Sequence, residues 1–378
     1  MNKPKIVWLN VSIFAITGLI ALIGVPYYAI FHGFDSFTII ATIITIGYCG
    51  MSITAGYHRL WAHKTYQAHP IIEFIFAIGG AFALQNSALH WASDHRVHHK
   101  HVDDNDKDPY SAKRGFWYSH IGWMLREYQS QRYHDYNNVR DLQRNKIVAW
   151  QHKYYVPLTL GTNFGIPIAL GFIHGEMVAM ILSVGVLRLV INHHATFFIN
   201  SLAHIWGKRP YTDKNTARDN GILAFFTYGE GYHNFHHIFE HDYRNGIKWW
   251  HYDPTKWLIK SFSYLKLTSG LRTSPEDRIE KARADMLLKS TTAKLQKMAN
   301  YHEQLERLQQ EHEKLMIRLN EYYGTKRELL ELKKQKMADS FEHSQLNERY
   351  QSFKSNWDSQ KKQWLKINQQ LLFSHQTA

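Results

Sequence analysis

The chain has 378 residues, with 45 lysines and arginines against 32 aspartates and glutamates, which gives a formal net charge of +13. It contains one cysteine, which excludes a disulfide framework and a metal cluster held by thiolates. The length is enough for more than one domain. Residues 1–273 are rich in Ile, Phe, Trp, Tyr and Gly, whereas residues 274–378 are dominated by Lys, Glu, Gln and Leu. We therefore expect two domains, 1–273 and 274–378.

Four apolar runs are long enough to cross a membrane, which takes about 20 residues. They are Ile6–Tyr27, Phe37–Tyr57, Val156–Phe172 and Met177–Phe198. The first run is too long for a cleaved signal peptide, so we expect it to be a retained span. The mean hydropathy of -0.41 conceals these runs, because the polar second half of the chain lowers the average.

A fifth apolar run, Ile71–Leu89, lies between two histidine-rich segments. If it crossed the membrane once, those segments would lie on opposite sides and could not share a site. We therefore expect it to lie on the membrane, to dip into it, or to pack in the domain that holds the histidines. Positive charge marks the cytoplasmic side. Lys3, Lys5 and the loops 96–114 and 126–146 are basic, so the histidine site and both termini are expected to be cytoplasmic.

Nine histidines occur at spacings typical of metal ligands. The first group is His58 and His63, the second is His95, His98 and His99, the third is His233, His236 and His237, and His204 follows Asn200 by four residues. Positions i, i+3 and i+4 of an α-helix share a face, so the second and third groups can each point into one space. Neutral imidazole suits iron, copper, zinc and nickel. Nine such ligands indicate two ions rather than one.

The first group has a different spacing. Five residues of α-helix rotate the second side chain by about 140° from the first. We therefore expect the helix to break near Leu60 or Trp61, or else His58 and His63 to serve different ions.

The order and sequences of these groups resemble those of the membrane-bound acyl-CoA desaturases of the stearoyl-CoA type. The matching stretches are Gly56–His63, Trp91–Lys100, Asn200–His204, Gly229–His237 and Asp242–Arg244, within a likeness that covers Val7–Leu267. The resemblance implies an all-α protein with four transmembrane spans, a cytosolic histidine-rich di-iron cap and a C-terminal helical tail. It implies two irons held by the nine histidines, with Asn200 contributing through a water molecule.

The implied reaction inserts a cis double bond into a saturated acyl chain, with O₂ and two electrons, and Δ9 is the family's common outcome. No catalytic group beyond the metal ligands is expected. Asp94 and Asp242 lie beside the histidine groups, and we expect them to accept the second N–H of ligating imidazoles.

The resemblance also implies where the substrate binds. Positions that match the family's acyl tunnel are Ile46, Gly50, Gln85, Trp91, Thr196 and Phe197, and Asn86 matches a residue that contacts CoA. Ser93 stands where the family has an Arg that helps to hold CoA. After Gly122–Leu125, only Arg126 remains of a basic pair. The acyl carrier is therefore left open between CoA, which we place first, and a membrane lipid.

Residues 274–378 are expected to be helical and in part a coiled coil. Leu305, Leu308, His312, Leu315, Leu319 and Tyr322 step by three and four residues. The partner of this seam is a second copy of the chain, another protein, or the later segment with Trp357 and Trp364 folded back. A single solvated helix is the alternative.

The sequence lacks the His-Pro-Gly-Gly haem motif of a fused cytochrome b5 domain. Electrons are therefore expected from a separate donor of the cytochrome b5, ferredoxin or reductase type. The other expected partners are an acyl-CoA or acyl-lipid substrate, the bilayer and a coiled-coil partner, with no nucleic acid. Two other functions are considered: a related membrane di-iron hydroxylase, and a membrane scaffold that acts through the tail. The presence of all nine candidate ligands argues against the scaffold.

Overall fold

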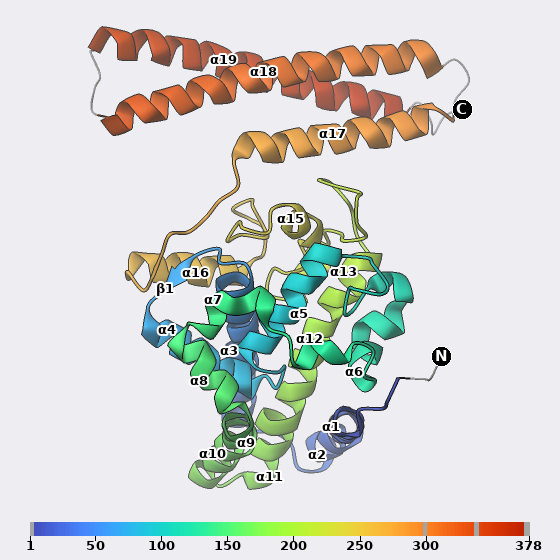
Figure 1. Ribbon diagram of the computed structural model, residues 1–378, viewed down its shortest axis with the longest axis vertical. Coiled ribbons are helices and arrows are strands. Elements are labelled where there is room, and N and C mark those ends of the chain that lie inside the picture. Colours follow the sequence, from blue (N-terminus) through green and yellow to red (C-terminus); the bar gives the residue numbers. More distant parts are fainter. Residues whose placement is uncertain (1–3, 298–300, 336–339, 374–378) are drawn as a thin grey trace. The chain divides into compact units, whose positions relative to one another are not determined.

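The computed structural model describes residues 4–297, 301–335 and 340–373, and the described residues are mostly helical (Figure 1). Their contacts separate them into two compact units. The membrane unit comprises residues up to Lys208 together with Lys214–Thr273, and the tail unit comprises Arg209–Asp213 together with the residues from Ser274 onward. The histidine groups belong to the membrane unit.

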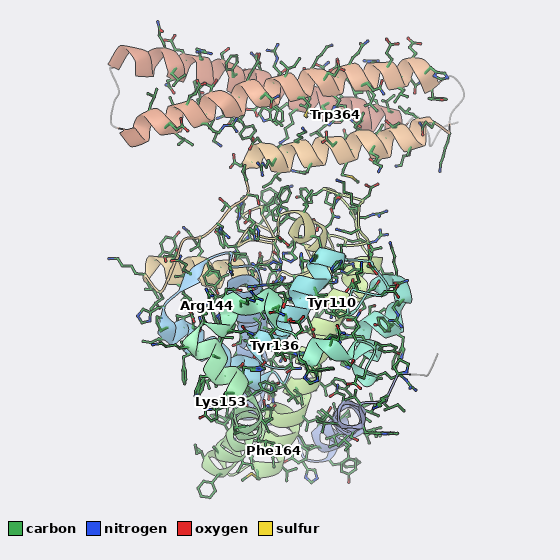
Figure 2. The ribbon with its side chains drawn as sticks, in the orientation of Figure 1. Tyr110, Tyr136, Arg144, Lys153, Phe164 and Trp364 are labelled. Atoms are coloured by element: carbon green, nitrogen blue, oxygen red, sulfur yellow. The ribbon has the colours of Figure 1, made fainter. Side chains whose placement is uncertain are left out.

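Four helical segments of the membrane unit are long and apolar enough to cross a bilayer. They are Trp8–Phe31, Ser36–Ala62, Tyr155–His174 and Met177–Ile205. The four predicted spans are thereby confirmed, with ends that differ from the predicted ones by a few residues. Large apolar side chains such as Ile43 and Phe164 are exposed on the spans, and Phe164 is labelled in Figure 2. Apolar residues on the outer sides are what lipid contact requires, and the chain is an integral membrane protein.

Most spans consist of α-helical pieces joined by π-helical segments. The α-helical pieces are α1 (Trp8–Leu19), α2 (Val25–Phe31), α3 (Ser36–Met51), α9 (Tyr155–Leu160), α10 (Ile166–His174), α11 (Met177–Met180), α12 (Arg188–Asn200) and α13 (Leu202–Ile205). The π-helical segments are Ile20–Gly24, Ser52–Ala62, Gly161–Gly165 and Ile181–Leu187. Capping fixes the start of the second span, because the Asp35 carboxylate accepts a hydrogen bond from the Thr38 amide at 2.8 Å.

The fifth apolar run forms α4 (Pro70–Phe82), which is shorter than a span. Pro70 at the first helical position and the His69 cap before it fix where the helix begins. The Tyr48 hydroxyl donates to the carbonyl of Ile75 at 2.7 Å and ties α4 to the second span. Histidines from both sides of α4 lie in one group, so α4 does not carry the chain across the membrane, as predicted.

A helical cap lies at one end of the spans (Figure 1). Its helices are α5 (Ala88–His101), α6 (Trp123–Leu125), α7 (Arg140–Gln143), α8 (Lys146–Lys153), α14 (Gly221–Phe226), α15 (His233–Ile238) and α16 (Pro254–Tyr264). Strand β1 (Gln67–Ala68) pairs antiparallel with β2 (Thr268–Ser269), with Gln67 opposite Ser269. This pairing joins the residues that follow His63 to the end of the membrane unit.

The tail unit contains α17 (Glu276–Leu295), α18 (Tyr301–Gln335) and α19 (Ser340–Phe373) (Figure 1). The buried seam of α18 packs with α17 and α19, and the cluster includes Leu308, Leu315, Leu319, Tyr322, Trp357, Trp364 and Ile367. Trp364 lies among these helices in Figure 2. The structure therefore agrees with one of the three predicted partners, the later segment folded back. A coiled coil with another chain stays a prediction.

Candidate metal centre and adjoining cavity

The nine histidines singled out in the sequence come from His204 and from three sequence segments, which we call the first (58–63), second (95–99) and third (233–237) histidine boxes. In the structure they form two groups. The five-histidine group contains His58, His63, His95, His99 and His236, and the four-histidine group contains His98, His204, His233 and His237. Within each group the ligand atoms all lie within 4.8 Å of one another. The Nε2 atoms of His63 and His95 are 2.8 Å apart, and those of His204 and His233 are 3.1 Å apart. Each group therefore presents converging nitrogen atoms.

Neighbouring histidines of one helix serve different groups. In α5, His95 and His99 belong to the five-histidine group, whereas His98 belongs to the four-histidine group. In α15 the reverse holds, since His233 and His237 lie in the four-histidine group. Successive residues of an α-helix point about 100° apart, which separates His98 from His99. The expectation that the second and third boxes each point into one space is thereby corrected.

A π-helix brings the two histidines of the first box, His58 and His63, to the same side. Ser52–Ala62 is wound with hydrogen bonds from residue i to residue i+5, and the amide of His63 donates to the carbonyl of His58 at 3.1 Å. A wider turn brings residues five apart to the same side. His58 and His63 therefore share one group without a break at Leu60 or Trp61, and both alternatives derived from α-helical geometry are wrong.

Carboxylates hold the second ring nitrogen of several histidines. Nδ1 of His98 lies 2.9 Å from Oδ1 of Asp108, Nδ1 of His99 lies 3.1 Å from Oε2 of Glu240, and Nδ1 of His58 lies 2.9 Å from Oε2 of Glu230. An ionised carboxylate only accepts hydrogen bonds, so the contacts of His98 and His99 favour a proton on Nδ1 and a free lone pair on Nε2. Nδ1 of His58 lies close to Glu230 but is not aligned with it for a hydrogen bond. The donor set suits a cation that prefers imidazole.

His204 has an indirect link to a carboxylate. Its Nδ1 lies 2.9 Å from the Thr216 hydroxyl, which donates to Oδ1 of Asp103 at 2.6 Å. The Thr216 amide donates to the other oxygen of Asp103 at 2.7 Å. Asp103 has a φ of +68°, a conformation that is uncommon outside glycine. The two bonds from Thr216 help to hold it in place.

Burial keeps several of the candidate ligand imidazoles neutral. It lowers the pKa well below the usual range, and neighbouring imidazoles lower it further, for His63, His95, His233, His236 and His237. Burial also lowers the pKa of His99 to about 4, although Glu240 opposes this shift. Neutral rings at pH 7 leave their lone pairs available for a metal ion.

A buried ion cluster connects the first and third boxes. Arg59 donates to Oε1 of Glu230 through Nε at 3.1 Å and Nη2 at 2.9 Å, and its Nη1 lies 3.0 Å from Asp253. Burial alone would raise the pKa of Glu230, but the adjacent His58 and Arg59 lower it overall. Glu230 is therefore a carboxylate that contacts a ligand of the first box while belonging to the third.

The two acids predicted to orient ligands contact arginines. Asp94 accepts from Nε of Arg132 at 3.0 Å and lies 3.3 Å from Nε2 of His90. Asp242 accepts from Arg244 at 2.9 Å. Their role towards the ligands stays a prediction.

Sequence reasoning missed Asp108, Glu240 and Thr216 as partners of the ligands. Glu240 follows His237 by three residues, and Asp108 lies in the acidic loop directly after the second box. Their closeness in sequence to the histidine boxes could have identified these two acids as partners of the ligands. Thr216 carried no such signal, because it lies twelve residues from His204 and no helix joins the two.

A cavity of about 150 Å³ adjoins the five-histidine group. Among its lining residues are Gln85, Asn86, Trp91, Thr196, Phe197 and Asn200. The Trp91 ring stacks on His95, with centroids 4.8 Å apart and planes at 24°. The cavity wall is therefore in direct contact with His95 of the five-histidine group.

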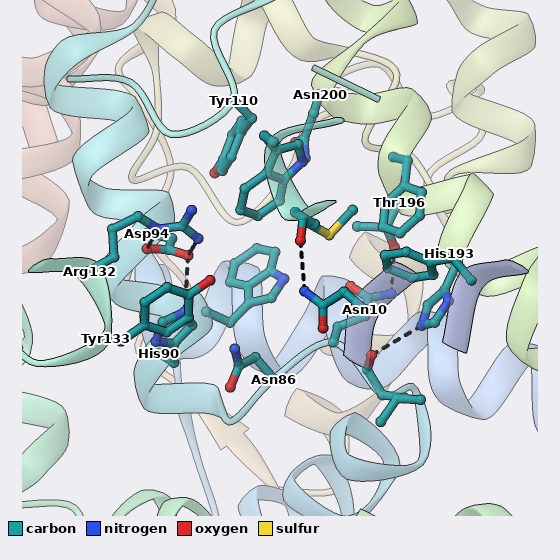
Figure 3. A pocket seen from close by; sticks show the side chains of 17 residues that line it. Asn10, Asn86, His90, Asp94, Tyr110, Arg132, Tyr133, His193, Thr196 and Asn200 are labelled. Carbon is teal, nitrogen blue, oxygen red and sulfur yellow. Dashed lines mark hydrogen bonds and ion pairs between the residues drawn. The ribbon is translucent and has the colours of Figure 1, made fainter. Parts of the chain in front are cut away.

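Figure 3 shows two sides of this cavity. Asp94, Arg132, His90 and Tyr133 gather on one side, with Thr196 and His193 on the other and Asn10 and Asn86 between them. The Gln85 amide donates to the Thr196 hydroxyl at 2.8 Å. The cavity therefore combines aromatic walls with amide and charged groups.

Ile46 and Gly50, the predicted end of the acyl tunnel, do not line this cavity. The Tyr228 hydroxyl donates to the carbonyl of Ile46 at 3.2 Å. A Cβ built on Gly50 would lie 2.2 Å from the Tyr228 ring, so only glycine allows this approach.

Ser93 and Arg126, the two positions that differ from the family's CoA-binding pattern, donate hydrogen bonds to other residues of the chain. The Ser93 hydroxyl donates to Asn138 at 2.8 Å. Arg126 donates to the carbonyl of Pro4 at 2.9 Å, which ties it to the amino-terminal segment. Arg132, which was not singled out in the sequence, brings a guanidinium to the cavity.

The family model described as fatty acid desaturase matches residues 36–268, more than half of the chain. The chain belongs to the fatty acid desaturase family. A relative of Schizosaccharomyces pombe, named "Probable acyl-CoA desaturase", is 43% identical over 265 residues, which cover 69% of this chain and 55% of the relative. Acyl-CoA desaturase 1 of Saccharomyces cerevisiae is 44% identical over 234 residues, covering 62% of this chain and 46% of the relative.

A third relative within this desaturase family matches over nearly its whole length. The sn-2 palmitoyl-lipid 9-desaturase of Nostoc sp. is 35% identical over 281 residues, which cover 72% of this chain and 93% of that protein. By contrast, the chain spans about half the length of the two yeast relatives. The names of the three relatives include both acyl-CoA and acyl-lipid desaturases.

Proposed function

We propose that this chain is an oxygen-dependent desaturase that converts a saturated fatty acyl-CoA into its cis-monounsaturated form, at the Δ9 position. The observation that carries the proposal is the pair of histidine groups beside a cavity whose wall includes Trp91. Two relatives are named acyl-CoA desaturases. The overall balance is an acyl chain, O₂, two electrons and two protons giving the alkene and two molecules of water.

We propose two iron ions as the cofactor, one in each histidine group. The nine histidines would hold them, and Asn200, four residues before His204, would contribute through a water molecule. Bound iron supplies, with O₂ and two electrons, the oxidising power that no side chain has for an unactivated methylene. Asp108, Glu230 and Glu240 would fix the orientation of the imidazoles, because each lies 3.1 Å or less from a ligand Nδ1.

The chain's own residues would bind and shield the substrate. Trp91, Phe197 and Phe14 give the cavity apolar walls, which suit an acyl chain and keep water from the reacting carbons. The buried Oε1 of Gln85 accepts no hydrogen bond from any of the residues that the structure describes. The pantetheine arm of CoA carries amide N–H groups that would serve this oxygen, whereas a lipid ester carries none. This difference favours CoA over a lipid carrier.

Orientation and electron supply complete the proposal. The cap and both termini lie on the cytoplasmic side, as the basic loops 96–114 and 126–146 favour. A separate protein supplies the electrons.

We propose residues 1–273 as the desaturase domain and residues 274–378 as a helical domain for assembly or partner contact. Trp364 and its neighbours form the separate core of that second domain.

The deciding experiment measures metal and products in the same preparation. The full chain is purified from iron-supplemented cells, its metal content is measured by mass spectrometry, and it is incubated with stearoyl-CoA, cytochrome b5 and a reductase. We expect two irons per chain and a monounsaturated product by gas chromatography. His236→Ala should lose iron and product together, and full iron with full activity in that variant would show that the ligand set is wrong.

The same assay separates the competing functions. Hydroxylated acids in place of alkenes would identify the related hydroxylase. No product and no electrons drawn from the donor system, despite two irons per chain, would favour the scaffold. Supplying the stearoyl group in phosphatidylcholine tests the carrier: desaturation of the lipid but not of stearoyl-CoA would reverse our assignment of CoA.

A further inference from the structure

An exposed aromatic patch lies on the membrane unit outside the four spans. We define this patch as Ile222, Phe225 and Phe226 of α14 with Tyr252 and Trp257, all of which are exposed large hydrophobic residues. The Phe225 ring lies 5.3 Å from Phe226 and 4.9 Å from Tyr252, and Tyr252 lies 5.5 Å from Trp257. These contacts join the four aromatic residues into one continuous surface, and Ile222 lies on the same helix as Phe225 and Phe226. Contiguous exposed apolar area of this kind marks an interaction site.

The patch is fixed directly to the second span. Tyr228, two residues after Phe226, donates to the carbonyl of Ile46 at 3.2 Å. Thr255, two residues before Trp257, shares a 2.7 Å hydrogen bond with Thr54 and donates to the carbonyl of Tyr228 at 2.8 Å. Ile46 and Thr54 both belong to the span Ser36–Ala62. Both ends of the patch are thus attached to a helix that crosses the bilayer.

The neighbouring surface of that span faces lipid. Ile43 is exposed on the second span and lies three residues before Ile46, about 4.5 Å along the helix axis. The patch therefore continues an apolar surface that the membrane already covers.

The outer face of α16 has the composition of a membrane interface. Trp257, Lys260 and Tyr264 are exposed and follow the spacing i, i+3 and i+7, whereas Ile259 is buried on the opposite side. Nζ of Lys260 lies 4.9 Å above the Tyr264 ring. Aromatic rings beside lysines are typical of the headgroup region, where the ring rests on apolar groups and the ammonium remains hydrated.

We propose that α14 and the outer face of α16 form a lipid-binding surface in addition to the four spans. Ile222, Phe225 and Phe226 enter the boundary of the acyl chains, and Trp257, Lys260 and Tyr264 lie among the headgroups. The third histidine box begins a few residues after Phe226, so this contact fixes the height of the metal-binding groups above the bilayer. The inference does not depend on the reaction that the chain catalyses.

Fluorescent labelling at single cysteines tests the proposal in the full chain. The native Cys49 is buried, so an introduced cysteine takes the label. Phe226→Cys is labelled with an environment-sensitive dye and reconstituted into phosphatidylcholine vesicles, with or without nitroxide-labelled lipid. Ile43→Cys, on the exposed side of the second span, is the lipid control. Lys107→Cys, in an exposed loop of the cap, is the water control.

We expect the nitroxide lipid to quench the dye at position 226 at least half as strongly as at position 43. We also expect iodide in the buffer to quench it several-fold less than at position 107. Iodide quenching equal to that at position 107 would show that the patch faces water. Protection from both quenchers would show that a protein surface, such as a second copy or an electron donor, covers the patch. Either result overturns the lipid assignment.

Folding is controlled separately. Each labelled protein must elute as a single species and keep the metal content of the unmodified chain. Where Phe226→Cys fails this requirement, Ile222→Cys on the same helix takes its place, with the same expected outcome. Trp257→Cys tests the second element and should be quenched most strongly by a nitroxide near the headgroup.

Discussion

Nδ1 of His98 and Oδ1 of Asp108 lie 2.9 Å apart, and both side chains are buried. The carboxylate also accepts hydrogen bonds from the amides of Asp103 and Tyr110. The loop that follows the second histidine box therefore folds back and holds a histidine of that box. Through Asp103 and Thr216, the same loop reaches His204.

Asp108→Asn should weaken metal binding in the four-histidine group by about 10- to 100-fold, because the imidazole loses the charged acceptor that fixes its orientation. Metal content after dialysis against a graded chelator measures this effect. Asp106→Asn, an exposed acid of the same loop, is the matched control and should behave like the unmodified protein. Equal metal retention in both variants would contradict the role of Asp108.

Thr216→Val should destabilise the fold and the four-histidine group. The substitution keeps the shape of the side chain, but it removes the hydroxyl between Nδ1 of His204 and Asp103. Leaving buried polar atoms unpaired costs about 1–3 kcal/mol. Thr216→Ser retains the hydroxyl and should restore both thermal stability and metal content. A Val variant that matches the Ser variant in both measurements would contradict the role of the Thr216 hydroxyl between His204 and Asp103.

Gly50→Phe should shift the products towards shorter acyl chains. Even a Cβ at position 50 would lie 2.2 Å from the Tyr228 ring, so a phenyl group there must push that ring aside. The phenyl group itself would then fill part of any path towards Ile46. Gly47→Phe is the control on the same span, since nothing lies within 4 Å of a Cβ at Gly47. Product chain length is measured by gas chromatography with mixed substrates. Identical spectra at equal protein levels would remove the tunnel assignment.

Arg96→Lys should lower the free energy of unfolding by about 1.5–3 kcal/mol, the range for a lost hydrogen bond from a charged group. Arg96 donates to the carbonyls of Trp61 and Ala62 at 2.8 and 2.9 Å and to both oxygens of Asp141. A lysine cannot reproduce this fork of donors. Arg140→Lys, at an exposed position, should change little. Thermal unfolding in detergent compares the two, and equal losses would contradict a special role for Arg96.

Trp364→Ala should unfold the tail unit at a lower temperature while the metal content stays unchanged. Trp364 is 2% exposed in the core of that unit, and truncating a buried Trp costs about 3–5 kcal/mol. Leu365→Ala changes the next residue, which is 45% exposed, and should have a much smaller effect. The helical signal of the tail during heating is measured alongside iron. Iron loss in the Trp364 variant would show that the tail takes part in the metal centre.

The sequence alone determined the spans and the identity of the candidate ligands. Apolar runs of about 20 residues have few folding options other than a membrane helix. Histidines three or four residues apart lie on neighbouring turns of any helix, so their spacing identifies them as candidate ligands whatever the tertiary fold. The path of α4 also followed from the sequence, because histidines on both sides of it had to meet. These inferences depend on local periodicity and on chain continuity.

Only the tertiary structure decided how the ligands are shared. His98 and His99 are neighbours in sequence but belong to different groups, because successive helical positions point about 100° apart. The π-helix that brings His58 and His63 together has no signature in the spacing of its residues. Glu230, Asp108 and Thr216 reach their histidines across 10 to 172 residues of chain. Such contacts depend on how distant segments pack, which local sequence patterns do not specify.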